Sequence, residues 1–330
     1  MTNFSLTPPL PVSAKQENQT KDNGTLNSCS IGYYTDIEWL VYILNCVACI
    51  FGLPGNGAVI WLLGFHMKRN PFTTYILNLA VADFGVLTLG ILSAIRVFLV
   101  TNCRSLMLIS VVRLLLFHLM FSISQFLLTL ISMDRCVAVL FPIWYRCHRP
   151  EKLSTILCGS VWIFCFLIHG ICCTLIVFKV FHGFTILFFV FLVNAVVSLP
   201  LITISALILF IRFCFKSQQH RRRKLLKAIL LTLFFYLFLA CPLNVMYIMF
   251  FHPLSPYDRN SPTNINLFYV GYLCASVNSF VNPLIYFLVG RKKKGLCAEN
   301  LRLILQRVFK QEEEVYGEEL QLSVQTQLPA

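Results

Sequence analysis

Charged side chains are scarce in this sequence, and acidic side chains are the scarcest. Of its 330 residues, 27 are Lys or Arg and 14 are Asp or Glu, so that charged residues make up 12% of the chain. Soluble domains carry about 25%. Hydrophobic residues reach 57%, above the usual share in a soluble domain. This composition excludes an ordinary soluble domain and indicates a protein embedded in a membrane.

Features of metal enzymes and of disulfide-rich scaffolds are also missing. The seven histidines have no metal-type spacing, and Asp83 has no second carboxylate near it in the sequence, which argues against an intramembrane enzyme. Most of the 14 cysteines fall in apolar runs or on the predicted cytoplasmic side, where cysteine is usually a small buried hydrophobe. Cys29 and Cys103 lie on the predicted outer side, and a bridge between them and free thiols throughout are both open.

Seven long apolar runs predict membrane-spanning helices, because each has about 20 residues or more. We therefore expect an all-α membrane protein, with a seven-transmembrane helix bundle over residues 37–289. The head, residues 1–36, is too short for a second domain and lacks the apolar core of a signal peptide, so the first span is expected to direct insertion. The predicted spans are Ile37–Gly64, Phe72–Val100, Ser105–Leu140, Leu153–Phe178, Phe184–Ile211, Leu225–Phe251 and Ile265–Val289.

The net charge of the chain is +13, and its basic residues are concentrated on one side of the predicted membrane. This distribution is better explained by the orientation of the spans than by nucleic-acid binding. Assigning the loops after the first, third and fifth spans, the adjoining helix ends and the tail to one side places 20 of the 27 basic residues there. This positive-inside bias predicts an extracellular N-terminus and a cytoplasmic C-terminus in the plasma membrane, with basic segments near anionic lipids. The head carries glycosylation sequons at Asn3, Asn18 and Asn23, which agrees with this orientation.

Two short motifs occupy the inner ends of two spans: Asp134-Arg135-Cys136 and Asn282-Pro283-Leu284-Ile285-Tyr286. An arginine in a span must face protein or water, and a proline there needs neighbouring helices to satisfy the freed backbone. Together the motifs resemble those of the rhodopsin-like G-protein-coupled receptors. The resemblance implies a switch in which Asp134 pairs with Arg135 at rest and Arg135 later extends into a G-protein cleft, while Tyr286 moves inward. The alternative is an arginine that only snorkels at a helix end.

Polar residues also gather in the middle of the spans, where an ionised carboxylate is costly and needs partners. Their oxygen atoms suit a small hard cation or ordered water. In the resemblance the matching positions form a sodium-and-water pocket that collapses on activation, so Na⁺ at Asp83 is the one cofactor expected. The alternative is a set of separate interhelical hydrogen bonds. The residues are Asn56, Asp83, Ser124, Asn278, Ser279 and Asn282.

Prolines inside the spans predict hinges, because the missing N–H and the ring bend a helix. Pro54, Pro200, Pro242 and Pro283 lie within spans. Bends at Pro242 and Pro283 would let the inner ends of the sixth and seventh spans move.

The predicted cytoplasmic surface combines cations with apolar residues. Ile143 stands among basic residues between the third and fourth spans and is expected to contact the G protein. Residues 290–310 place apolar residues at helical spacing beside a basic face, which predicts a short amphipathic eighth helix on the membrane surface. Residues 311–330 are expected to be a disordered tail that recruits arrestin weakly, because it offers few phosphate acceptors. These acceptors are Tyr316, Ser323 and Thr326.

Longer strings narrow the resemblance. Residues Trp61 to Thr73 and Pro142 to Pro150 look like those of the Mas-related receptors, and the similarity extends from about Leu44 to Phe309. The chain is thus expected to activate heterotrimeric G proteins, and the resemblance implies Gq/11 or Gi/o. The leading alternative is a seven-span channel or transporter, against which the two halves show no inverted repeat. Enzymatic activity is not expected.

The chain departs from the wider receptor class at three informative positions. Ser110 replaces the usual outer cysteine, and Ala240 replaces the tryptophan two residues before Pro242. Arg222 stands where an acidic partner of Arg135 is common. The resemblance therefore implies weak locking of the inactive state and some ligand-independent activity.

The outer half of the bundle is expected to hold an extracellular ligand. Phe117 stands where amine receptors carry an aspartate, and Ser276 where opsins carry the retinal lysine, which disfavours monoamines and retinal. The only acidic residue of the outer halves is Glu38 at the rim, so an acidic or amphipathic small molecule or a peptide carboxylate is expected. Alternatively, the two arginines of this half, Arg96 and Arg113, snorkel to the lipid headgroups, and its histidines, His118 and His169, are core residues with satisfied hydrogen bonds. The predicted pocket residues are Arg96, Arg113, Phe117, His118 and His169.

Overall fold

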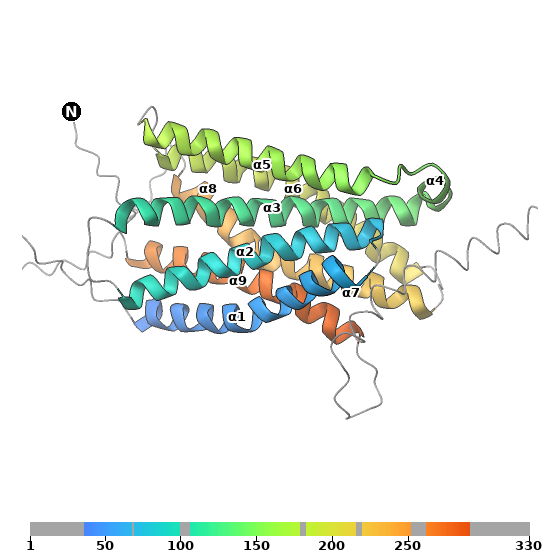
Figure 1. Ribbon diagram of the computed structural model, residues 1–330, viewed down its shortest axis with the longest axis horizontal. Coiled ribbons are helices and arrows are strands. Elements are labelled where there is room, and N and C mark those ends of the chain that lie inside the picture. Colours follow the sequence, from blue (N-terminus) through green and yellow to red (C-terminus); the bar gives the residue numbers. More distant parts are fainter. Residues whose placement is uncertain are drawn as a thin grey trace, which may run out of the picture.

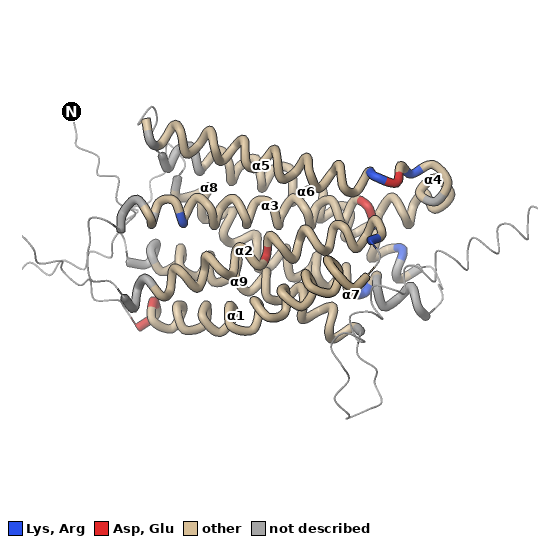
Figure 2. The backbone as a smooth tube through the Cα atoms, viewed as in Figure 1, with Lys and Arg blue, Asp and Glu red and all other residues tan. Residues whose placement is uncertain are grey.

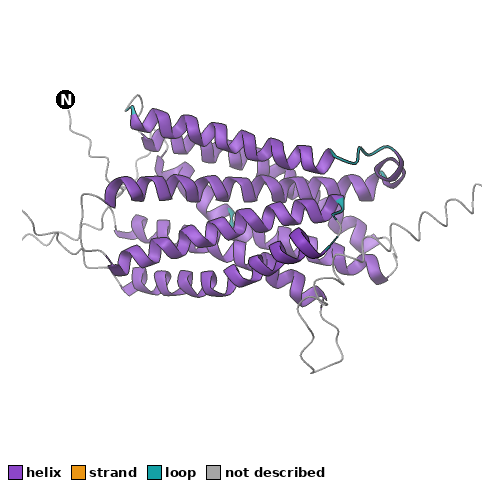
Figure 3. Ribbon diagram, in the orientation of Figure 1, coloured by secondary structure: helices purple, strands orange, loops and turns teal. Residues whose placement is uncertain are grey.

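The computed structural model describes residues 36–67, 69–99, 106–178, 183–215, 220–251 and 262–290. Within these ranges the regular structure is helical and contains no strand (Figure 3). The elements are α1 (Asp36–Trp61), the π-helix η1 (Leu62–His66), α2 (Pro71–Leu99), α3 (Leu106–Leu140), α4 (Pro142–Cys147), α5 (Leu153–Val177), α6 (Gly183–Phe215), α7 (His220–Leu239), α8 (Cys241–Phe251) and α9 (Pro262–Gly290).

Seven stretches of the described chain are long and apolar enough to cross a membrane. In this arrangement η1 continues α1, while α7 and α8 together form the sixth stretch, Leu226–Phe250. The long helices run side by side along the long axis of the molecule, and the short α4 lies beyond one end of α3 (Figure 1). We call this end of the bundle the α4 end. The predicted seven-helix bundle is confirmed.

Helix α3 occupies the centre of the bundle. In its most apolar stretch 72% of the residues are buried, against 22% in α5. Helix α5 therefore lies at the periphery of the bundle. Residues on α3 are consequently the best placed to contact several other helices at once.

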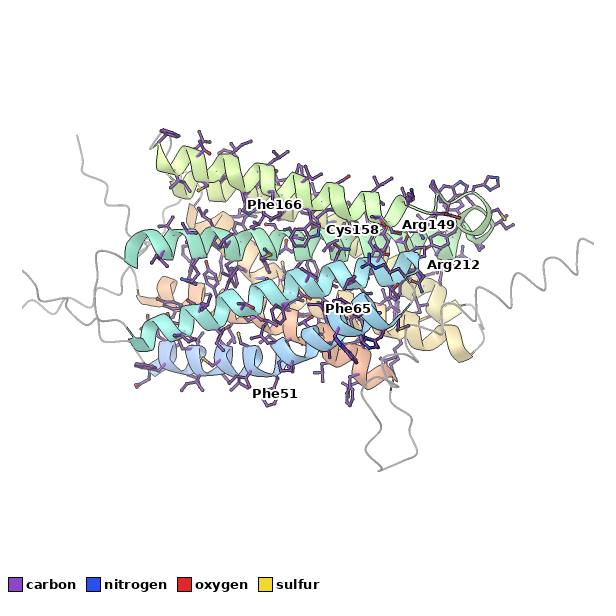
Figure 4. All side chains as sticks on the ribbon, in the orientation of Figure 1. Phe51, Phe65, Arg149, Cys158, Phe166 and Arg212 are labelled. Atoms are coloured by element: carbon purple, nitrogen blue, oxygen red, sulfur yellow. The ribbon has the colours of Figure 1, made fainter. Side chains whose placement is uncertain are left out.

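The outside of the bundle is apolar, which suits lipid rather than water. Phe51, Phe65 and Phe166 are 63%, 79% and 50% exposed, and Phe51 points away from the bundle below α1 (Figure 4). Polar residues occur inside instead, with Asp83 and Asn244 fully buried. Such an arrangement is expected where lipid tails surround the helices, because interhelical hydrogen bonds then satisfy the polar groups.

The prolines affect the helices differently. Pro54, Pro200 and Pro283 lie inside α1, α6 and α9, which continue through them. At Pro242 the sixth span breaks, with α7 ending at Leu239 and α8 beginning at Cys241, because Pro242 has no N–H for the carbonyl one turn earlier. The sixth span is therefore interrupted at Pro242, and bending or movement at the four prolines stays a prediction.

Helices α1 and α9 approach closely because α1 carries glycine at the crossing. A Cβ atom added to Gly55 would lie 3.1 Å from Cγ of Pro283, and one added to Gly52 would lie 3.2 Å from Cβ of Phe280. Small residues allow helices in membranes to pack backbone against backbone. This close contact fixes the part of α9 that carries the Asn282–Tyr286 motif.

Several predictions concern residues outside the described ranges. These are the sequons at Asn3, Asn18 and Asn23, the Cys29–Cys103 bridge, the amphipathic helix predicted over residues 290–310, of which only Gly290 is described, and the tail. The predictions on Arg96, Ser110 and Arg222 concern side chains that the structure does not describe, although their backbone lies in α2, α3 and α7.

Candidate functional site

A charged cluster surrounds Asp134 near the α4 end of α3. The Nε and Nη2 atoms of Arg135 donate hydrogen bonds to Oδ2 of Asp134, at 3.1 and 2.5 Å. Both side chains are nearly buried, with exposed fractions of 9% and 7%. The structure thus places the predicted switch pair in contact, with the guanidinium turned toward its neighbour on the same helix.

Two residues after α3 complete this cluster. The Tyr145 hydroxyl donates to Oδ2 of Asp134 at 2.9 Å, and Nη2 of Arg149 donates to Oδ1 at 2.6 Å. Arg149 also donates to Oγ of Ser154 at the start of α5, at 2.7 Å. Asp134 therefore holds two guanidinium groups and one phenol, and it joins α3 to α4 and α5. We call Asp134, Arg135, Tyr145 and Arg149 the Asp134 cluster.

Aromatic rings support the two cations of the Asp134 cluster. The guanidinium carbon of Arg135 lies 4.6 Å from the ring centroid of Phe72 on α2, and that of Arg149 lies 4.5 Å from the centroid of Tyr145. Cations attract the faces of aromatic rings, most strongly where water is excluded. Arg135 is consequently held by α2 as well as by Asp134.

The sequence motif did not assign roles to Tyr145 and Arg149, although both lie in the Pro142–Pro150 string. The turn of helix that returns Tyr145 to α3 begins at Pro142, a residue type common at the first position of a helix. Pro142, at the start of this six-residue helix, was the feature of the sequence that could have predicted the helical turn and the return of Tyr145 toward α3. Ile143 lies on the same helix and is 77% exposed, so it presents an apolar side chain beside the cluster.

Basic residues gather mostly at the α4 end of the described chain (Figure 2). Arg149 and Arg212 both lie there (Figure 4). Tyr286, the last residue of the second motif, is 5% exposed and lines a small cavity of about 10 Å³ together with Leu128 of α3 and Leu233 of α7. From α9, Tyr286 therefore faces residues of α2, α3 and α7 across this cavity.

A second polar cluster surrounds Asp83 in the middle of α2. Oδ1 of Asp83 accepts hydrogen bonds from the hydroxyls of Ser124 and Ser279, at 2.7 and 2.9 Å, and Oδ2 accepts one from Nδ2 of Asn282 at 2.6 Å. All four residues have exposed fractions of 2% or less. They join α2, α3 and α9 across the centre of the bundle, and we call them the Asp83 cluster.

The two remaining residues of the predicted pocket lie beside this cluster. Asn56 donates to the backbone carbonyls of Gly52 and Ser279, at 3.1 and 3.0 Å, so it ties α1 to α9. Asn278 is buried next to Ser279 but supplies none of the three hydrogen bonds to Asp83. The structure therefore assembles four of the six predicted residues directly and places Asn56 one contact away.

The predicted ligand residues do not form one site. His118 lies in an aromatic cluster: its Nε2 is 2.8 Å from the hydroxyl of Tyr272, and the hydroxyls of Tyr272 and Tyr247 are 2.6 Å apart. Phe117 packs against Tyr272, with ring centroids 4.8 Å apart. Arg113 is half-buried five residues before His118, toward the end of α3 opposite α4. Phe117, His118, Tyr247 and Tyr272 thus form one aromatic cluster between α3, α8 and α9.

His169 lies elsewhere. It is buried on α5 and lines a cavity of about 370 Å³ between α3, α5 and α6. Sequence position alone could not show the direction in which the ring of His169 points. Among the described residues, no group of three or more His, Cys, Asp and Glu side chains could hold a metal ion.

A family model of seven-transmembrane receptors of the rhodopsin family matches residues 55–286. The Mas-related G-protein coupled receptor member D of Homo sapiens is 35% identical over 319 residues, which cover 92% of this chain and 96% of that protein. The receptor of the same name in Macaca fascicularis is 35% identical over 84% of this chain and 87% of its own length. The Proto-oncogene Mas protein of Homo sapiens is 30% identical over 84% of each chain.

The chain belongs to the Mas-related receptors of the rhodopsin family. This membership confirms the resemblance noted from Trp61 to Thr73 and from Pro142 to Pro150. It identifies a multi-pass membrane protein that acts as a G-protein-coupled receptor, and it disfavours the channel or transporter. The matched segment contains both the Asp134 cluster and the Asp83 cluster.

Proposed function

We propose that this Mas-related receptor lies in the plasma membrane with the α4 end in the cytoplasm, binds an extracellular ligand at the opposite end, and activates Gq/11 or Gi/o. The observation that carries the proposal is the Asp134 cluster, which holds Arg135 through Asp134 and Phe72. The basic residues at the α4 end support this orientation, because cationic segments stay in the cytoplasm.

Activation in this proposal requires Arg135 to leave Asp134. The pair is nearly buried, and separating such a pair is costly unless each charge finds a new partner. A G-protein segment entering between the helices would supply new partners for Arg135, and the contacts of Tyr145 and Arg149 with Asp134 would break in the same step. The break at Pro242 and the proline at 283 offer places where α7 and the end of α9 bend to admit it.

The ligand is proposed to be an acidic or amphipathic molecule, or a peptide that presents its C-terminal carboxylate. Arg113 lies on α3 five residues, about 7.5 Å along the helix, from His118, on the side away from α4, and Phe117, His118, Tyr247 and Tyr272 form an aromatic cluster. A carboxylate would form a charge-assisted hydrogen bond with the guanidinium, and apolar parts would pack on the rings below.

The experiment is a ligand screen with calcium and cAMP readouts in cells that express the full chain. Peptides with free carboxylates are compared with the same peptides amidated at the C-terminus. Arg113→Ala should lower the potency of an acidic agonist, whereas Arg113→Lys, which keeps the charge, should retain most of it. A cationic agonist, or equal potency of the free and amidated peptides, would contradict the ligand proposal without affecting the proposed coupling.

We also propose that the Asp83 cluster binds Na⁺. The donor set fits a hard cation, because it offers a carboxylate and the hydroxyl oxygens of Ser124 and Ser279, which donate to Asp83 and keep lone pairs. A bound cation would balance the charge of the only carboxylate buried in the middle of the described bundle. Arrestin recruitment is proposed to be weak, since the tail has few phosphate acceptors.

A further inference from the structure

The cavity beside His169 is separate from the aromatic cluster of Phe117, His118, Tyr247 and Tyr272, none of which lines it. It has a volume of about 370 Å³ and lies between α3, α5 and α6. Sites for small molecules occupy roughly 300–1,000 Å³, so the cavity is large enough to receive part or all of a small ligand. Neither the Asp134 cluster nor the Asp83 cluster contributes to its lining.

The cavity is open on the outside of the bundle. Phe164 and Ile171 on α5 and Phe189 on α6 line it, yet they are 45%, 59% and 55% exposed. In a membrane protein these side chains face lipid. An occupant therefore arrives through the hydrocarbon, which excludes a peptide, because its backbone groups would lose water without gaining partners.

One polar group in the cavity is left unused. Nδ1 of His169 lies 2.9 Å from the carbonyl oxygen of Cys165, and since a carbonyl can only accept, Nδ1 carries the proton. Nε2 of this tautomer is an acceptor. His169 is 5% exposed, and its Nε2 atom is buried without a hydrogen-bond partner in the described part of the chain. A buried acceptor without a donor is costly.

We propose that this cavity binds a membrane-dissolved alcohol of the sterol class, whose hydroxyl donates to Nε2 of His169. A hydroxyl is the donor that the ring nitrogen requires, whereas an acyl chain or an ionised carboxylate has none. The rings of Phe126 and Phe164, with centroids 5.8 Å apart, line the cavity and suit a rigid apolar body. His169 is eight residues from the end of α5 at Val177, about 12 Å along the helix. At this depth the site lies within one leaflet of the bilayer.

Occupancy of this site bears on the packing of α3 against α6. Nδ2 of Asn194 on α6 donates to Oγ of Ser122 on α3 at 2.7 Å, and both residues line the cavity. A sterol seated there contacts the two helices on either side of that hydrogen bond. The site is therefore a modulatory one, and its occupant stabilises the relative position of α3 and α6 in the arrangement described here.

The test uses full-length receptor in phosphatidylcholine nanodiscs with a photoreactive cholesterol probe. Three variants are compared with the parent: His169→Phe, which removes the acceptor; Val190→Phe, which fills the cavity from a buried lining position; and Leu167→Ala, which alters a 61% exposed residue of α5 outside the lining. Cholesterol and its 3-keto analogue, which lacks the hydroxyl donor, are the competitors. Thermal unfolding of each variant checks that it is folded.

Labelling is expected in α5 and α6, with competition by cholesterol about tenfold stronger than by the ketone, the factor that one hydrogen bond provides. His169→Phe should weaken binding by a similar factor and remove the difference between the competitors. Val190→Phe should abolish labelling at this site, and Leu167→Ala should match the parent. Equal competition by alcohol and ketone in the parent receptor, unchanged labelling in His169→Phe, or labelling confined to other helices would overturn the assignment. Because binding is measured without agonist or G protein, these outcomes are independent of the proposed signalling.

Discussion

The Asp83 and Asp134 clusters both stabilise a buried or nearly buried carboxylate, but they do so with different partners. Asp83 accepts three hydrogen bonds from neutral groups, two serine hydroxyls and one amide. Asp134 is held by two guanidinium groups and a phenol. Neutral donors leave a net negative charge that a cation or a proton can neutralise. Cationic donors neutralise the charge directly and must be separated before Arg135 can act.

This difference assigns the two clusters different roles. The Asp83 cluster is suited to sensing a small cation, because its hydroxyl oxygens can turn toward an ion at little cost. The Asp134 cluster is suited to holding a resting state, because charge-assisted hydrogen bonds are stronger than neutral ones. Substitutions in the two clusters should therefore have distinct consequences.

The largest effect is expected from Arg135→Ala. Loss of the guanidinium removes the group proposed to contact the G protein, so calcium and cAMP responses should be abolished while surface expression is largely retained. Surface expression is measured with an epitope tag on the head, and Lys152→Ala, an exposed cation at the same end, serves as the control. Full responses from a well-expressed Arg135→Ala variant would sink the assigned role of this residue.

A smaller effect in the opposite direction is expected from Arg149→Ala. One charge-assisted hydrogen bond contributes roughly 1.5 kcal/mol or more, so ligand-independent signalling should rise about tenfold. Tyr145→Phe, which removes one neutral donor, should raise it less. Basal inositol phosphate or cAMP is measured at matched surface expression. If neither variant exceeds the parent, the Asp134 cluster does not restrain the receptor.

Asp83→Asn should change sodium sensitivity rather than basal activity. The amide removes the only anionic ligand of the cluster while keeping the size of the side chain and one acceptor oxygen, so a response that depends on sodium in the parent should lose most of that dependence. Agonist potency is compared in sodium and in N-methylglucamine buffers, with Ser279→Ala as a variant that keeps the carboxylate. Identical sodium dependence of parent and Asp83→Asn would show that the cluster is not a cation site.

The smallest effect concerns the packing that supports both clusters. Gly→Ala inside a helix usually gains about 1 kcal/mol from helix propensity, and Gly159→Ala should show this gain, because nothing lies within 4 Å of its added Cβ. Gly55→Ala should lose it, since its Cβ would lie 3.1 Å from Pro283 and overpacking costs about 1–3 kcal/mol. The unfolding temperatures of the two purified variants provide the measurement. Equal gains would mean that α1 and α9 are not in close contact there.

Much of the fold could be predicted because apolar length alone decides it. The seven runs have the length and composition that a bilayer requires, and the predicted spans agree with the helices to within a few residues, as Leu153–Phe178 against Leu153–Val177 shows. The Asp83 cluster was also predictable in outline, because polar residues in the middle of spans must find each other. The sequence could not show which of these residues form hydrogen bonds with each other: Asn56 donates to the carbonyl of Ser279 and not to Asp83.

The contacts that could not be predicted depend on the direction in which side chains point from their helices and on the turn of the chain between α3 and α5. His118 and His169 both lie in the half of the bundle opposite α4, but rotation about their helix axes directs one to the aromatic cluster and the other to the cavity near lipid. Tyr145 and Arg149 return to Asp134 only because the chain turns through α4. The weak lock expected from Arg222 stays a prediction. The contacts of Asp134 with Tyr145 of α4 and with Arg149 could not be inferred from the sixth span.

The most direct test of the Asp134 cluster as a resting lock is nucleotide exchange on purified G protein by purified receptor without ligand. The parent is compared with Arg149→Ala and with the double variant Arg149→Ala/Arg135→Ala. Exchange should be low in the parent, about tenfold higher in Arg149→Ala, and absent in the double variant, since release of Asp134 acts through Arg135. Exchange in Arg149→Ala at or below the parent's rate, or raised exchange that persists in the double variant, would contradict the account.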